Sequence, residues 1–161
     1  MENRLAMRQP RSNVLETDPM SCAFVEARAA LERGEVPVGA VIVRDGVIVS
    51  RAGNQTLRDQ DPTAHAEILA IRQACRAGAS ERLSGCDIYV TLEPCAMCAA
   101  AISFARLRRL YYAAPDAKGG GVDHGPRFFA QPTCHHAPEI YGGIRATEAA
   151  AMLTAFFMAR R

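Results

Sequence analysis

Apolar residues recur at helical spacing in several long stretches of the chain. The first helix is expected to begin at Asp18-Pro19, an N-cap residue followed by a proline that suits the first helical position, and to end at Gly34. The second is expected over residues 64–78, and a C-terminal helix over residues 146–161. A shorter apolar run at 96–106, directly behind a proline, predicts one more helix.

Runs of β-branched and apolar residues predict strands between these helices. Residues 38–54 contain two such runs around Asp45-Gly46, which is a strong signal for a two-residue hairpin turn. Residues 86–92 and 107–114 have the pattern of buried strands. The pattern places no further strand in the loop-rich region 119–145. Strands that alternate with helices predict an α/β layered domain whose sheet is partly parallel beyond the hairpin.

Length and composition favour one globular domain. The chain has 161 residues, of which 49% are hydrophobic and 22% charged. We expect the domain to span residues 19–161 and residues 1–18 to form a polar extension with little order. No apolar run reaches the roughly 18 residues that a membrane span needs, and none near the start has signal-peptide length. A cytoplasmic protein is therefore expected.

Charge and cysteine content narrow the possible chemistry. The net charge of +2 is too small to indicate nucleic-acid binding, although Arg-rich clusters occur at 106–109 and at the C-terminus. Six cysteines in a reducing compartment argue against a disulfide framework. They favour metal binding, catalysis or burial instead.

Two short motifs supply candidate metal ligands. Cys95 and Cys98 lie at the start of one predicted helix, one turn apart, and His65 lies at the start of another. One His and two Cys are a typical ligand set for a catalytic zinc ion, whose fourth position is left for water. A structural zinc would need a fourth protein ligand, and neither Cys86 nor Cys134 belongs to a second pair. Glu67, two residues beyond His65, is well placed to act on that water.

Joined along the chain, these motifs read H-x-E followed by P-C-x-x-C. This combination is the known signature of the zinc-dependent nucleobase deaminases. In such enzymes zinc makes a water nucleophilic at neutral pH, and the glutamate transfers protons while ammonia leaves. The signature predicts one Zn²⁺ per chain and a hydrolytic reaction.

Longer stretches carry a closer resemblance. The segments RGEVPVGAVIV, DPTAHAEI, TLEPCAMC, DAK and FFMARR resemble those of bacterial tRNA-specific adenosine deaminases, and the likeness runs from about Met20 to the C-terminus. It implies a three-layer α/β/α cytidine deaminase-like fold with a mixed five-stranded sheet. It also implies a cytoplasmic homodimer that converts the wobble adenosine of a tRNA anticodon to inosine.

The resemblance also assigns residue roles. By position, His65, Cys95 and Cys98 match the zinc ligands, and Glu67 matches the proton-transferring residue. The residues that match substrate contacts to an anticodon stem-loop are Asn54 at the target nucleotide, Asp116 and Lys118 in a loop against the RNA, and Phe156, Phe157, Arg160 and Arg161 in the C-terminal helix.

One segment departs from the best-known members of the family. The segment 119–145 is longer than in those proteins and has a different sequence, in which Cys134 precedes His135 and His136. A second metal site, RNA contact and plain loop packing are the alternatives for these three residues.

Three rival functions remain open on the sequence. The first is a free nucleobase or nucleoside deaminase acting on cytosine, cytidine or guanine with the same zinc chemistry. The second is a zinc-stabilised binding module, for which Glu67 would be dispensable. The third is a thiol redox protein that uses Cys95 and Cys98 without metal, but it would leave the H-x-E motif unexplained.

Overall fold

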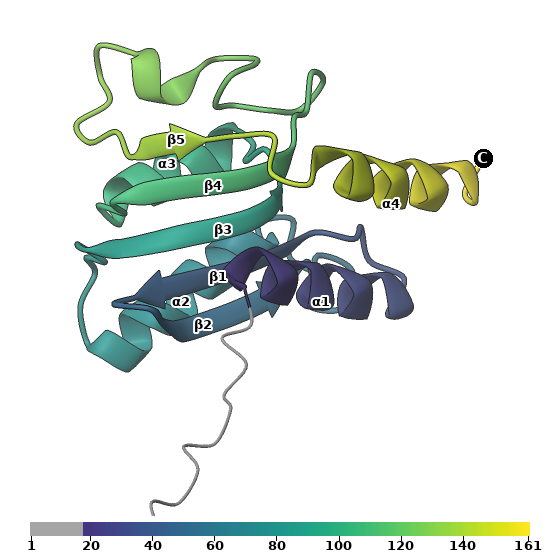
Figure 1. The fold of residues 1–161 in the computed structure, drawn as a ribbon, viewed down its shortest axis with the longest axis horizontal. Coiled ribbons are helices and arrows are strands. Elements are labelled where there is room, and N and C mark those ends of the chain that lie inside the picture. The colour runs from purple at the N-terminus through teal and green to yellow at the C-terminus, as the bar shows by residue number, and fades with distance from the viewer. Residues whose placement is uncertain (1–17) are drawn as a thin grey trace, which may run out of the picture.

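One mixed sheet organises the chain (Figure 1). The structure, a computed structural model, describes residues 18–161, and the prediction for the preceding residues lies outside this range. The strand order is β2-β1-β3-β4-β5, with β1 antiparallel to both neighbours and β3, β4 and β5 mutually parallel. The strands are β1 (Gly39–Arg44), β2 (Val47–Gly53), β3 (Cys86–Leu92), β4 (Arg109–Ala114) and β5 (Glu139–Tyr141).

The opening hairpin turns as its sequence predicts. Asp45 and Gly46 have φ values of 50° and 77°, which both lie in the left-handed region that a type I′ turn requires. This turn matches the twist of the flanking strands, so β1 and β2 pair directly. The Asp-Gly hairpin is confirmed.

The fifth strand lies in the region where the sequence pattern places none. β5 has only three residues, all of them exposed, so it carries no alternation of buried and exposed positions. Contacts with the neighbouring strands hold β5 in the sheet. The ring of Tyr141 stacks on that of Tyr111, which in turn stacks on that of Tyr89. This cross-strand stack joins β5 to β4 and β3.

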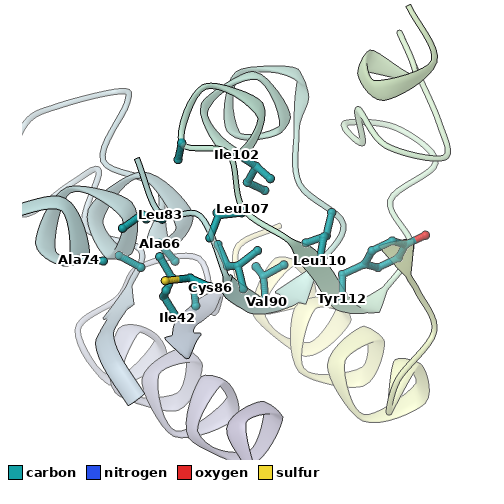
Figure 2. Packing of buried hydrophobic residues seen from close by; sticks show 14 of the residues in the cluster. Ile42, Ala66, Ala74, Leu83, Cys86, Val90, Ile102, Leu107, Leu110 and Tyr112 are labelled. Carbon is teal, nitrogen blue, oxygen red and sulfur yellow. The ribbon is translucent and has the colours of Figure 1, made fainter. Parts of the chain in front are cut away.

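Helices cover both faces of the sheet and complete three layers. The helices α2 (Ala66–Gly78) and α3 (Ala96–Phe104) pack on one face, where small residues such as Ala70 and Ala99 meet Ile42, Ile88 and Leu110. Figure 2 draws part of this core. The helices α1 (Pro19–Glu32) and α4 (Ala146–Met158) pack on the other face. The predicted three-layer α/β/α architecture is therefore confirmed.

Helix boundaries differ from the sequence pattern by a few residues: α2 begins at Ala66 and not at 64, and α3 ends at Phe104 and not at 106. Pro94 lies before the N-cap of α3 and not in its first turn, so the helix loses no hydrogen bond to it. The C-terminal helix ends at Met158, three residues before the end of the chain. Among the described residues, no helix is long and apolar enough to cross a membrane.

The backbones of α1 and β1 are in direct contact at Gly39. A substitution at this glycine therefore tests the packing of the helix on the sheet. A Cβ at Gly39 would lie 1.9 Å from the Ala23 carbonyl oxygen and 2.6 Å from the Ala27 nitrogen. Gly39→Ala should therefore lower the free energy of unfolding by about 3 kcal/mol, because one of the two elements must move. Urea denaturation measures this change.

The matched control for Gly39→Ala is Gly78→Ala. Gly78 is the last residue of α2, and a Cβ added there would have no neighbour within 4 Å, so alanine should be neutral or slightly stabilising. Equal stability of the two variants would contradict the close contact at Gly39.

Candidate active site

Two helix starts bring the predicted ligands together. His65 is the N-cap residue of α2 and Cys95 is the N-cap residue of α3. The two helices lie side by side on one face of the sheet and begin at the same end of it. Cys98 lies one turn into α3, so its thiol faces the same side as that of Cys95. Residues about thirty positions apart in sequence therefore converge at this end of the sheet.

The three donor atoms have the spacing of a tetrahedral zinc site. The Nδ1 atom of His65 lies 3.7 Å from Cys95 Sγ and 3.6 Å from Cys98 Sγ, and all three donors lie within 4.8 Å of one another. Tetrahedral zinc with ordinary Zn–N and Zn–S bonds would place nitrogen and sulfur about 3.5 Å apart. The two nitrogen–sulfur distances therefore fit zinc.

Protonation of the donors also suits a metal. A hydrogen bond from the Cys98 thiol, joined by one from His65, lowers the pKa of Cys95 to about 4. The same contact with Cys95, together with burial, raises the pKa of Cys98. Hydrogen bonding to Cys95 raises the pKa of His65 above its ordinary value. One thiolate is thus already favoured, and zinc would displace the remaining protons.

Glu67 lies beside these donors in the first turn of α2. Glu67 is only 4% exposed, and this burial raises the pKa of its carboxyl group to about 7. A bound cation beside it would offset part of that rise. A carboxyl group that titrates near neutral pH can both accept and donate a proton during a reaction.

The site opens into a cavity of about 300 Å³. Asn54, Thr56 and Asp116 line this cavity together with His65 and Glu67. The volume suits a single nucleobase and excludes a folded helix. The structure therefore gathers His65, Cys95, Glu67, Asn54 and Asp116 around one cavity, with the buried Cys98 next to His65 and Cys95.

Asn54 is held by a buried carboxylate, Glu35, whose role no sequence motif indicates. Its Nδ2 atom donates to Glu35 Oε2 at 3.2 Å and to Thr56 Oγ1 at 3.3 Å. Because a carboxylate only accepts hydrogen bonds, Glu35 determines which end of the amide faces it. Glu35 also accepts the backbone N–H groups of Leu57 and Arg58, so it fixes the loop that follows β2. The sequence signal for this role was the presence of one ionisable residue, Glu35, within the otherwise apolar stretch 34–38.

Asp116 and Lys118 lie on the rim of the cavity. Asp116 Oδ1 accepts the backbone N–H groups of Lys118 at 3.1 Å and Gly119 at 2.9 Å, which closes a tight turn. The side chain of Lys118 is exposed and lies outside the cavity lining. The two residues are thus near the entrance, with the lysine on the solvent side.

The four C-terminal candidates differ in their surroundings. Phe156 is buried, whereas Phe157 is 52% exposed and lines a second hollow that shares Asp116 with the first cavity. The Arg160 guanidinium lies 3.6 Å from the centre of the Phe156 ring and donates to the Gly34 carbonyl at 3.3 Å. Arg161 is exposed. Phe157 and Arg161 are therefore available to a ligand, while Arg160 ties the end of α4 to the turn after α1.

The cysteine and histidines of the divergent loop pack against the fold. Cys134 Sγ and Ser103 Oγ both contact the His136 carbonyl oxygen, and His136 Nε2 donates to the Leu107 carbonyl at 2.7 Å. The carbonyl of His135 accepts from Arg106. Within residues 18–161, the zinc donors are the one cluster of three or more such side chains with metal-binding spacing. Loop packing accounts for Cys134 and His136, whereas the side chain of His135 is exposed.

Comparisons with known proteins agree with the site. The family described as the cytidine and deoxycytidylate deaminase zinc-binding region matches residues 15–114, which is more than half of the chain. A tRNA-specific adenosine deaminase of Agrobacterium fabrum is 61% identical over 88% of this chain and 93% of its own.

Two solved structures are also similar. A protein from a study of A-to-I editing by tRNA:A34 deaminases at the wobble position of transfer RNA is 62% identical, with a TM-score of 0.83 over 84% of this chain and 98% of its own. A guanine deaminase of Bacillus subtilis is 32% identical, with a TM-score of 0.61 over 87% of this chain and 92% of its own.

The fold and the H-x-E and P-C-x-x-C site define a zinc-dependent deaminase. Within this class, the chain belongs to the family of tRNA-specific adenosine deaminases. The resemblance on which the sequence analysis relied is confirmed, as is zinc as the cofactor.

The metal site gives a direct prediction. Purified protein should contain about one zinc ion per chain, and Cys98→Ala should lose it because two donors remain. Since the donors belong to two different helices, removal of zinc by a chelator should also lower the melting temperature. Elemental analysis and thermal denaturation measure the two effects. Active protein with negligible zinc would contradict the site.

Proposed function

We propose that this protein deaminates adenosine to inosine at the wobble position of a tRNA anticodon. The observation that carries the proposal is the convergence of the zinc donors, Glu67 and Asn54 on one base-sized cavity, in a chain of this family. The overall reaction consumes one water, replaces the exocyclic amine of adenine with oxygen, and releases ammonia.

Each residue of the cavity has a part in this reaction. His65, Cys95 and Cys98 would hold zinc, which when bound supplies Lewis acidity that makes water nucleophilic at neutral pH. In two successive transfers, the Glu67 carboxylate accepts the two protons of the attacking water and delivers one to a ring nitrogen and the other to the departing amine. Burial of Glu67 keeps its carboxyl group ready to hold the proton between these two transfers.

The shape of the site favours an unpaired nucleotide. A base in an anticodon loop can leave its neighbours at low cost, because no base pair must be opened. Asn54, oriented by Glu35, is placed to contact the target nucleotide inside the cavity. Asp116 and Lys118 on the rim and Phe157 in the adjoining hollow would contact the rest of the loop, and the exposed Arg161 would add a positive charge for phosphates.

Assembly into a cytoplasmic homodimer is a further part of the proposal. Large apolar side chains are exposed on the surface, the most exposed being Phe104 at the end of α3 at 73% and Leu57 after β2 at 70%. A dimer interface that included these side chains would remove their apolar surface from water. A second copy of this chain is the partner that we propose.

A free-base deaminase is the second candidate function. The similarity to a guanine deaminase favours it, since a base-sized zinc cavity by itself does not require RNA. The two candidates differ in the groups outside the cavity, because a free base would make no contact with Lys118, Phe157 or Arg161.

The role of Glu67 separates an enzyme from a zinc-stabilised binding module. Glu67→Gln keeps the size of the side chain and removes its ability to transfer protons, so the rate of deamination should fall by at least about a hundredfold. Zinc content and melting temperature should stay close to those of the wild type. Single-turnover assays give the rate, with Cys98→Ala as the variant that loses both metal and activity. Retention of most of the rate in Glu67→Gln would refute the proton-transfer role.

Substrate preference tests the tRNA assignment. An anticodon stem-loop should be deaminated efficiently, whereas free adenosine, guanine and cytosine should react very poorly because they lack the contacts on the rim. Contacts to phosphates release counterions, so kcat/KM for the stem-loop should fall steeply with salt concentration. Mass spectrometry of the products at two salt concentrations measures both effects. Efficient, salt-insensitive turnover of a free base would favour the second candidate.

A further inference from the structure

Glu93 is a buried carboxylate that the proposed chemistry does not use. Its side chain is 0% exposed, and it lies between the end of β3 and the Pro94-Cys95 turn. Burial of a charge without partners costs several kcal/mol, so an ionised group in this place needs hydrogen-bond donors.

All five donors come from one loop, residues 116–124, which we call the rim loop. The Oε2 atom accepts the backbone N–H of Asp116 at 2.9 Å and the Nδ1–H of His124 at 2.8 Å. The Oε1 atom accepts the backbone N–H groups of Val122 at 3.2 Å, Asp123 at 2.8 Å and His124 at 3.0 Å. One carboxylate therefore binds both ends of the rim loop.

The middle of the rim loop packs against the metal-binding turn. A Cβ at Gly120 would lie 2.5 Å from Glu93 Oε1, and a Cβ at Gly121 would lie 2.5 Å from the Ala96 nitrogen. The Gly121 N–H also donates to the Pro94 carbonyl at 2.8 Å. The rim loop thus lies directly on the first residues of α3, with no space for side chains between them.

We infer that Glu93 is a positioning residue that holds Asp116 and Lys118 in their RNA-binding arrangement before the substrate arrives. The inference rests on the proposed function. A loop that is ordered in advance loses less conformational entropy when RNA binds. Loss of Glu93 should therefore weaken binding and leave the chemical step nearly unchanged, because none of the hydrogen bonds of Glu93 involves Glu67 or the zinc donors.

The test is Glu93→Gln, assayed on an anticodon stem-loop. A glutamine presents an NH₂ group to backbone N–H donors, so part of the rim loop should detach. We expect KM to rise about tenfold and kcat to stay within about twofold, with zinc content unchanged. Loss of a phosphate contact by Lys118 should make the slope of log kcat/KM against log salt shallower by about 0.7. For the same reason, Glu93→Gln should add little to the KM of Lys118→Ala.

A matched control separates positioning from stability. Asp87 is a buried carboxylate at the opposite end of β3, where it is paired with Arg108. Asp87→Asn should lower stability but leave KM and the salt slope unchanged. If Glu93→Gln does not fold, His124→Ala removes one of the five hydrogen bonds and should raise KM about threefold. Amide hydrogen exchange provides a readout without substrate, since the backbone amides of residues 122–124 should exchange faster in either rim-loop variant.

The possible outcomes distinguish the two proposals. Wild-type activity on the stem-loop with an unchanged KM and salt slope in the rim-loop variants would overturn the role of Glu93 alone. Loss of zinc or a parallel fall in kcat would make Glu93 a support of the metal site and would also overturn it. Failure of the wild type to deaminate the stem-loop would overturn the proposed function and this inference together.

Discussion

The whole site depends on two helices that begin at the same edge of one sheet. His65 and Cys95 are N-cap residues, so their positions are set by where α2 and α3 start and not by flexible side chains. Alanines on the inner faces of these helices, such as Ala66 and Ala99, let both lie close to the strands. Exposed N–H groups at the helix starts favour negative charge on the thiols. Packing in the core thereby determines the geometry and the protonation of the zinc donors.

A second level of order comes from buried carboxylates that bind backbone rather than substrate. Glu35 fixes the loop and the amide of Asn54 on one side of the cavity, and Glu93 fixes the rim loop on the other. A carboxylate with several N–H donors is rigid because each bond lost would leave a buried charge less compensated. The cavity is therefore bounded by loops whose shapes are determined by charge burial, although loops of this length are usually mobile.

Much of this architecture could be predicted from local patterns. Periodicity identified the four helices and four strands, and the Asp45-Gly46 turn followed from the φ values that it needs. The zinc donors were recognisable because ligand type and spacing are local properties. Other features depend on contacts between distant segments. The three exposed residues of β5 have no pattern of their own, Glu93 reads as an ordinary acidic residue, and Arg160 reads as a free cation although it lies on Phe156.

The short fifth strand has a consequence for solubility. The outer side of β5 has no neighbouring strand in the described part of the chain, so its backbone groups could in principle recruit a strand from another molecule. Three residues offer too few hydrogen bonds for stable addition of such a strand, and Glu139, paired with Arg109, places charge along the same border. A β5 lengthened into the flanking loop would remove this protection. Because β5 is short, the sheet ends at this strand, and edge-to-edge aggregation of the protein is disfavoured.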